Sequence, residues 1–245
     1  MTTHSILPED WDLPIVFRRR IGDQVGRQRP MVADGHLLLV LHAPPHPNQT
    51  RRTGRFFWRS LDESWRYSGD GDTSLTIHQH LDEYEHLIDR CEQQEESAQT
   101  ADEYFKVLEQ LPSLLRTIGN LHQALQEARK ECPDFREIIN LRDRAYALDR
   151  TAELLYNSTK IALEVEVARR AEAQARASED MAWSAHRLNR LAAFFFPIAT
   201  LTSVFGVSLK HGLEELSAPW AFLTLIGFGL LLGLILTRFI DSSDQ

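Results

Sequence analysis

Two uncharged stretches near the end of the sequence constrain this chain more than any other feature. Residues 191–209 and 219–237 each run for 19 residues without Asp, Glu, Lys or Arg. An α-helix of that length spans roughly 28 Å, close to the ~30 Å hydrocarbon core of a bilayer. The sequence therefore predicts a membrane protein with two transmembrane helices, although the mean hydropathy of the whole chain is −0.32.

The connection between these stretches, residues 210–218, is so short that the two spans must be antiparallel neighbours. Basic residues near the ends of a span tend to stay in the cytoplasm. The loop has only Lys210, whereas the flanks of the spans have Arg169, Arg170, Arg176, Arg187, Arg190 and Arg238. We therefore expect both termini to be cytoplasmic, the loop to be periplasmic, and the protein to lie in the inner (plasma) membrane.

The net charge of −8 is concentrated in the middle of the chain. Residues 76–180 contain 13 basic and 22 acidic side chains, a balance that disfavours nucleic acid as a partner. Cys91 and Cys132 lack metal-ligand spacing, which suits a reduced cytosolic setting. The sequence has no glycine-rich phosphate loop, G-x-S-x-G elbow or H-E-x-x-H pair, so we expect neither an enzyme nor a resident cofactor.

Residues 1–75 predict a small α/β or β-rich cytoplasmic unit. The apolar run at 36–41 is typical of a buried strand, and residues 55–59 and 61–67 suggest two strands joined by a polar turn. Seventy-five residues are few for an independent core, so we expect this unit to pack against the helices that follow.

Helical periodicity begins after residue 73. We expect one helix over 75–96, capped by Asp72 or Thr73, and another over 101–130. After Pro133 neither proline nor glycine occurs until Pro197. A seven-residue repeat in that interval predicts a coiled-coil stalk that packs against other stalks; its two rows are Ile138, Ala145, Ala152 and Thr159, and Leu141, Leu148, Leu155 and Ala162.

The predicted fold class is therefore a mainly α membrane protein in which a long stalk helix continues into the first span. The expected segments are the N-terminal unit (1–75), a cytoplasmic helical pair (76–132), the stalk (133–190), the first span (191–209), the periplasmic loop (210–218), the second span (219–238) and a cytoplasmic tail (239–245).

The segment 187–208, with Pro197 inside it and Phe205-Gly206-Val207-Ser208 at its end, resembles the C-terminal hairpin of CorA-type divalent cation channels. That family has a long cytoplasmic helix that runs into the first span and an aromatic-Gly-Met-Asn motif at its outer end. The resemblance covers residues 134–245 well and 75–130 in outline.

The resemblance implies a funnel-shaped homopentamer that passes divalent cations, magnesium or a related ion, passively through a pore lined by the first span. Its second span would face lipid. The implied pore face consists of Leu188, Ala192, Phe196, Ala199, Ser203, Gly206, Val207 and Ser208. Glu214 and Glu215 in the loop would attract cations to the outer mouth.

The motif departs from the family at two positions, where Val207 replaces Met and Ser208 replaces Asn. A serine hydroxyl is shorter than the amide and lacks its carbonyl, which changes how a hydrated ion would be received. Two alternatives therefore stay open. The first is a non-conducting, membrane-anchored scaffold or effector, and the second is a zinc transporter of the same superfamily.

Ligand-type side chains also occur at His78, His80, Asp82, Glu83 and His86. On a helix, His78 and His80 point about 200° apart, so they do not share one ion. No resident metal site is assigned from the sequence.

Overall fold

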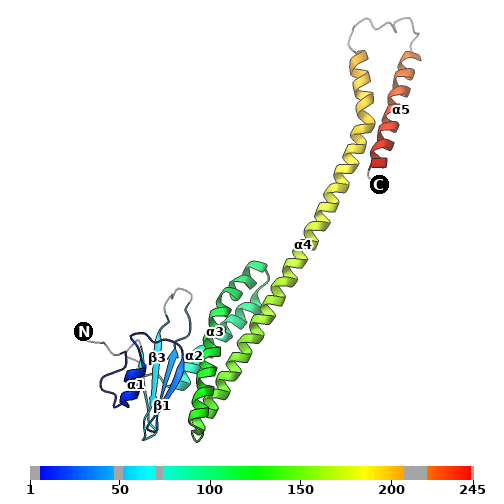
Figure 1. Ribbon diagram of the computed structural model, residues 1–245. Coiled ribbons are helices and arrows are strands. Elements are labelled where there is room, and N and C mark those ends of the chain that lie inside the picture. Colours follow the sequence, from blue (N-terminus) through cyan, green and yellow to red (C-terminus); the bar gives the residue numbers. More distant parts are fainter. Residues whose placement is uncertain (1–5, 47–51, 70–73, 207–219, 244–245) are drawn as a thin grey trace. The chain divides into compact units, whose positions relative to one another are not determined.

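The computed structural model describes residues 6–46, 52–69, 74–206 and 220–243 (Figure 1). The chain divides into two compact units, Met1–Ala168 and Arg169–Gln245. The first contains a short helix α1 (Ile15–Arg20), a sheet, helices α2 and α3, and the beginning of α4. The second contains the end of α4 and helix α5 (Trp220–Ser243).

The sheet is an antiparallel meander of four strands in the order β1-β2-β3-β4. Its strands are β1 (Arg29–Ala33), β2 (His36–His42), β3 (Gly54–Arg59) and β4 (Trp65–Gly69). The strand expected at 36–41 is confirmed. The strand expected at 61–67 begins four residues later, because Ser60 to Ser64 form the turn, in which Ser60 N donates to Ser64 O.

β1 was not predicted, although Asp34-Gly35 marks its hairpin with β2. Both turn residues have positive φ, 52° and 80°, and Ala33 pairs with His36 across the turn. Two consecutive residues with positive φ make the tight turn that matches the twist of a hairpin, and Asp-Gly is a preferred pair for it.

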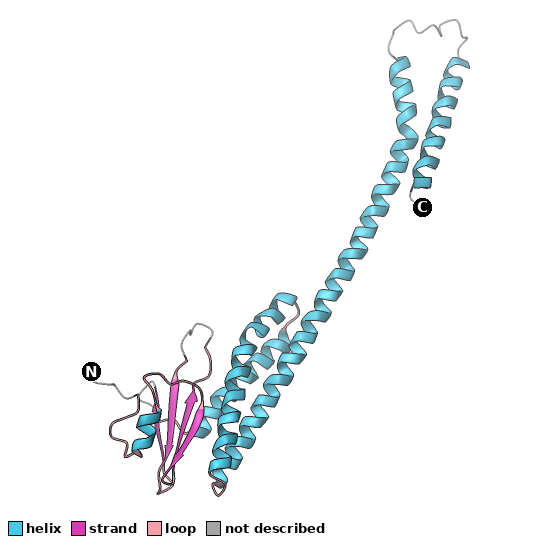
Figure 2. Ribbon diagram, viewed as in Figure 1, coloured by secondary structure: helices cyan, strands magenta, loops and turns pink. Residues whose placement is uncertain are grey.

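Both faces of β2 are buried, which explains its uninterrupted apolar sequence. Leu37, Leu39 and Leu41 face the core formed with α2, α3 and α4. Leu38 and Val40 face a second core, which includes Trp11 and Phe17 of the segment around α1. Figure 2 shows α1 on one side of the sheet and the long helices on the other. The expectation that the sheet packs against the helices is therefore confirmed.

Helices α2 (Ile77–Ser97) and α3 (Ala101–Glu131) each begin with a capping box. Thr76 caps α2 together with Gln79, and Thr100 caps α3 together with Glu103. The reciprocal bonds satisfy amide groups that the first helical turn leaves free. The cap predicted at Asp72 or Thr73 was wrong, because the helix begins after Thr76.

Helix α4 (Arg136–Gly206) is continuous for 71 residues, as the absence of proline and glycine before Pro197 predicted. Its heptad rows have a different role from the one expected. The first row is buried as far as Thr159 and the second as far as Leu155. Their apolar members pack against α2, α3 and the sheet of the same chain. The predicted packing of this seam against other stalks was therefore wrong for residues 138–155.

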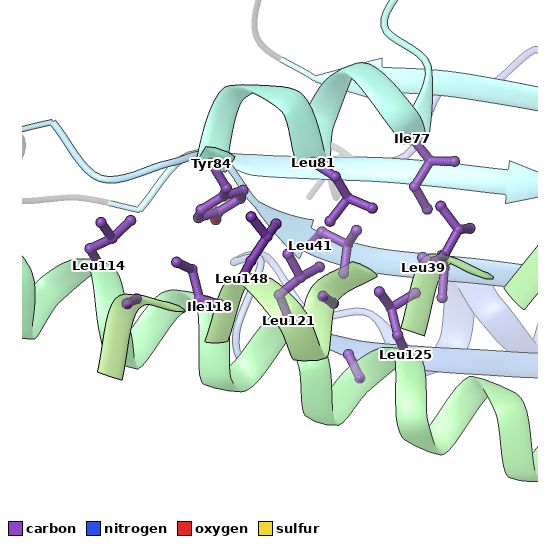
Figure 3. Close-up of a cluster of buried hydrophobic side chains, with 14 of the residues drawn as sticks. Leu39, Leu41, Ile77, Leu81, Tyr84, Leu114, Ile118, Leu121, Leu125 and Leu148 are labelled. Atoms are coloured by element: carbon purple, nitrogen blue, oxygen red, sulfur yellow. The ribbon is translucent and has the colours of Figure 1, made fainter. Parts of the chain in front are cut away.

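The shared core joins four elements in one layer of side chains. Figure 3 shows Leu39 and Leu41 from β2 meeting Leu81 and Tyr84 from α2, with residues of α3 below them. Leu148 of α4 points into the same layer. The early part of α4 is thus fixed to the sheet and to the helical pair.

Candidate functional site

The unit 169–245 is built around a close approach of α5 to the end of α4. A Cβ atom added to Gly233 would lie 2.7 Å from the Phe194 carbonyl oxygen, and one added to Gly229 would lie 3.1 Å from Ile198 Cγ1. The partner positions fall as the glycine positions rise, so the helices run antiparallel. Glycine is required at Gly233 because any larger residue would meet backbone.

This approach gives the end of α4 two different faces. The face toward α5 is half-buried and includes Phe194, Ile198 and Leu201. The side chains predicted to line a pore lie outside this contact and are all exposed within one chain; they are Leu188, Ala192, Phe196, Ala199 and Ser203. Leu188 is 67% exposed and Phe196 is 71% exposed, so the large apolar side chains on this face are not covered by the rest of the chain.

The remaining predicted site residues lie at the end of α4 and beyond it. Gly206 is the last residue of the helix. Val207, Ser208, Glu214 and Glu215 lie outside the described residues. The altered motif and the acidic outer mouth therefore stay predictions.

The predicted membrane spans also stay predictions. Within the described ranges, no helix combines the length and the apolar character needed to cross a bilayer. Each uncharged 19-residue stretch extends beyond those ranges, into residues 207–209 and residue 219.

A second polar site lies in the unit 1–168, where β3 packs against α2. Arg55 Nη1 is 2.9 Å from His80 Nδ1 and 2.6 Å from Glu83 Oε2. His80 is fully buried, and its ring lies 5.3 Å from the rings of both Phe57 and Tyr84. The guanidinium donates to Nδ1, so the ring proton sits on Nε2, which has no partner among the described atoms.

Burial and the neighbouring Arg55 charge lower the pKa of His80 to about 3. The ring is therefore neutral throughout the physiological range. Burial likewise raises the pKa of Tyr84, whose hydroxyl donates to the His42 carbonyl at 2.8 Å. The sequence signal for this site was the apolar stripe of α2, because His80 falls at helical spacing between Ile77 and Tyr84.

The structure separates the histidines and carboxylates that resembled metal ligands. His78 Nε2 lies 3.5 Å from Glu137 Oε1, while Asp82 pairs with Arg144 at 2.5 Å. Arg144 also contacts Glu85, so one guanidinium of α4 holds two carboxylates of α2. No group of three metal-ligand side chains occurs in the described part of the chain, and these residues fasten α2 to its neighbours instead.

Comparison with known proteins shows what fold the chain has. No protein-family model and no curated protein matches the sequence. The structure of the full-length CmaX protein matches with a TM-score of 0.56 and 14% identity, over 95% of this chain and 83% of that chain. The ZntB cytoplasmic domain from Vibrio parahaemolyticus RIMD 2210633 matches with a TM-score of 0.53 and 11% identity, over 66% of this chain and 80% of that chain.

A third structure, the CorA magnesium transporter from Methanocaldococcus jannaschii, matches less closely, with a TM-score of 0.38 and 13% identity over 91% of this chain and 82% of that chain. At these identities the likenesses to CmaX and to the ZntB domain show a common fold. The fold is a small antiparallel sheet followed by a long helical region, as the sequence predicted.

Proposed function

We propose that this chain is an inner-membrane protein that conducts divalent cations through a pore formed by the α4 helices of five copies. The observation that carries the proposal is the exposed face of α4 from Leu188 to Ser203, which lies opposite the face that α5 covers. Along this face, small residues separate the large apolar residues Leu188 and Phe196 and follow Phe196. Five such faces around an axis would leave a narrow path, constricted at the level of each large residue.

The remainder of α4 supports assembly from several copies. Beyond Thr159 most of the described side chains of the helix are exposed within one chain, including Ile161, Val165 and Trp183. In proteins most of the stability of a helix comes from packing of its apolar face rather than from the helix alone. Packing against equivalent helices would bury these side chains. The seam for this packing would begin after the part of α4 that the chain's own core occupies.

The membrane location rests on the sequence and on exposed side chains of α5. Two uncharged 19-residue stretches are long enough to span the hydrocarbon core. Large apolar side chains of α5 are exposed in one chain, where lipid would cover them; they include Leu223, Phe228, Leu231, Leu234 and Ile235. The positive charges before the first stretch favour cytoplasmic termini.

The fold supports the same proposal through its neighbours. One of them is described as the cytoplasmic domain of ZntB, so a related arrangement of sheet and helices occurs on the cytoplasmic side of another protein. We place residues 1–190 on that side in this protein. The sheet and the helical pair would then be the part through which cytoplasmic signals reach α4.

Ion selection would occur at Gly206 to Ser208. A ring of serine hydroxyls accepts hydrogen bonds from the water shell of a cation, so a hydrated ion would enter without losing its first shell. Leu188 and Phe196 would form apolar constrictions, which close a pore when they lose water. Glu214 and Glu215 would raise the cation concentration at the outer mouth.

Ion flux into dye-loaded proteoliposomes tests this proposal. The natural chain and Ser208→Asn are compared with empty vesicles for magnesium, cobalt, nickel and zinc. We expect saturable flux from the natural chain and a changed order of ions with Ser208→Asn. A preference for zinc would favour the zinc-transporter alternative. A folded oligomer without flux in either form would favour the non-conducting scaffold.

A further inference from the structure

We propose that a pocket between α2 and α3 binds a small organic anion that has an apolar body, such as an aromatic carboxylate or an aromatic phosphate ester. This inference does not depend on the proposed pore. It concerns the unit 1–168 alone.

The pocket has a volume of about 630 Å³, within the usual range for small-molecule sites. Its floor is apolar, because Leu114 and the Cys91 thiol are each 1% exposed and Leu87 is half-buried. The polar part of the lining includes Arg90 of α2 and Lys106, Glu109 and Gln110 of α3.

Positive charge is concentrated at this pocket in an otherwise acidic pair of helices. Residues 76–132 contain five basic and twelve acidic side chains. Two of the five basic residues, Arg90 and Lys106, line the pocket, whereas Glu109 is the only one of the twelve acidic residues to do so. If the charged residues of the two helices were placed at random, the lining of the pocket would be negatively charged. The positive charge of the lining therefore favours an anionic ligand.

Both cations are available to a ligand. Neither Arg90 nor Lys106 forms an ion pair with any described carboxylate, whereas Arg55 and Arg144 elsewhere on this unit both do. An arginine offers a planar pair of N–H donors to a carboxylate or phosphate, and a lysine adds a mobile point charge. The anionic group would lie at these two side chains while the apolar body covers Leu87 and Leu114.

A neighbouring pocket extends the same groove. It has a volume of about 270 Å³ and shares Lys106 and Gln110 with the first. Gln110 Nε2 donates to Gln94 Oε1 across the two helices at 3.4 Å. A ligand that also fills this second pocket would contact Gln94 of α2 and Lys106 of α3 together and would stabilise their packing.

Isothermal titration of the full-length chain in detergent solution tests the proposal. The probes are 2-naphthoate and 2-naphthyl phosphate. Naphthylmethylammonium controls for charge, and acetate and inorganic phosphate control for the apolar body. We expect at least one naphthyl anion to bind at least tenfold more tightly than all three controls.

Matched variants locate the binding. Arg90→Gln combined with Lys106→Gln should weaken anion binding at least tenfold. Arg116→Gln combined with Lys130→Gln removes the same charge from exposed positions of α3 that do not line the pocket, and it should leave binding unchanged. Equal binding of the naphthyl cation, or equal loss in both double variants, would overturn the proposal.

Cysteine alkylation gives a second readout in the natural chain. Cys91 lines the pocket and Cys132 does not, so mass spectrometry of the two alkylated peptides contains its own control. A saturating naphthyl anion should slow alkylation of Cys91 at least threefold relative to that of Cys132. An unchanged ratio would place the ligand elsewhere and would contradict the proposed site.

Discussion

At the scale of residues, two buried polar side chains of the sheet–helix core affect the stability of the fold. His80 has lost its water and lies beside Arg55, so its charged form is disfavoured in the folded state. Tyr84 needs its single acceptor, the His42 carbonyl, because burial leaves it no water. The stability of the fold therefore depends on the protonation state of His80 and on the hydrogen bond of Tyr84, as well as on packing.

The lowered pKa of His80 predicts that acid destabilises the fold. The unfolded chain takes up the proton near pH 6.5, whereas the folded chain resists it down to about 3. The stability that the folded chain gains by keeping His80 neutral is therefore fully present above about pH 7.5. It is lost as the pH falls from 6.5 toward 3. Between pH 7.5 and pH 5 this loss is about 2 kcal/mol.

Urea unfolding at several pH values measures this effect. His80→Phe should flatten the fall in the free energy of unfolding between pH 7.5 and pH 5. His86→Phe, at an exposed position of the same helix, should leave the fall unchanged. Equal pH dependence in the two variants would show that His80 is not held neutral.

Removing the Tyr84 hydroxyl should also destabilise the unit 1–168. Tyr84→Phe leaves the buried His42 carbonyl without this donor, at a cost of about 1–2 kcal/mol. Tyr146→Phe removes a hydroxyl from a side chain that is 58% exposed and should change stability by less than about 0.5 kcal/mol. The midpoints of urea unfolding compare the two, and similar midpoints would contradict the assigned hydrogen bond.

At the scale of elements, local signals in the sequence predicted what forms but not always what it packs against. The apolar run at 36–41 was sufficient to predict β2, and the interval without proline or glycine was sufficient to predict one continuous helix α4. The heptad rows of α4 had the correct period, yet a seven-residue spacing is equally suited to a partner helix from the same chain. α2 and α3 cover it as far as Leu155.

Of the two missed features, β1 had a local signal in its turn, whereas the polar site of Arg55 depended on a contact distant in sequence. β1 contains Arg29 and Pro30, which are not typical of an apolar strand, and it pairs with β2 across the Asp34-Gly35 turn. The pairing of Arg55 with His80 and Glu83 joins a strand to a helix 25 residues away. Spacing along one segment does not contain such information.

The approach of α5 to α4 predicts unequal roles for two glycines of α5. Gly233→Ala should destabilise the helical hairpin, because its Cβ would lie 2.7 Å from the Phe194 carbonyl oxygen. Gly227→Ala should be tolerated, because no atom lies within 4 Å of the added Cβ.

Thermal melting of the purified chain in detergent compares the two glycine variants. We expect a lower melting temperature for Gly233→Ala and an unchanged or slightly higher one for Gly227→Ala, since alanine favours the helix. Equal melting temperatures would contradict the close packing of the two helices.

At the scale of the whole molecule, the proposed pore forms only when several chains assemble. The exposed face of α4 and the exposed apolar side chains of α5 have no cover in a single chain. We predict that the protein extracted in mild detergent has the mass of five chains by light scattering corrected for bound detergent. A stable dimer or monomer would contradict the proposed pore.

Cysteine accessibility combined with flux measurement tests whether the face of α4 from Leu188 to Ser203 lines a conducting path. Ser203→Cys places a thiol on that face, whereas Leu201→Cys places one on the half-buried face near Gly229. The natural cysteines are buried, and the unsubstituted chain controls for them. A charged methanethiosulfonate reagent should reduce divalent-cation flux by more than half in Ser203→Cys and leave Leu201→Cys unchanged. Equal inhibition of both variants, or no flux before treatment, would show that this face of α4 does not line a conducting path.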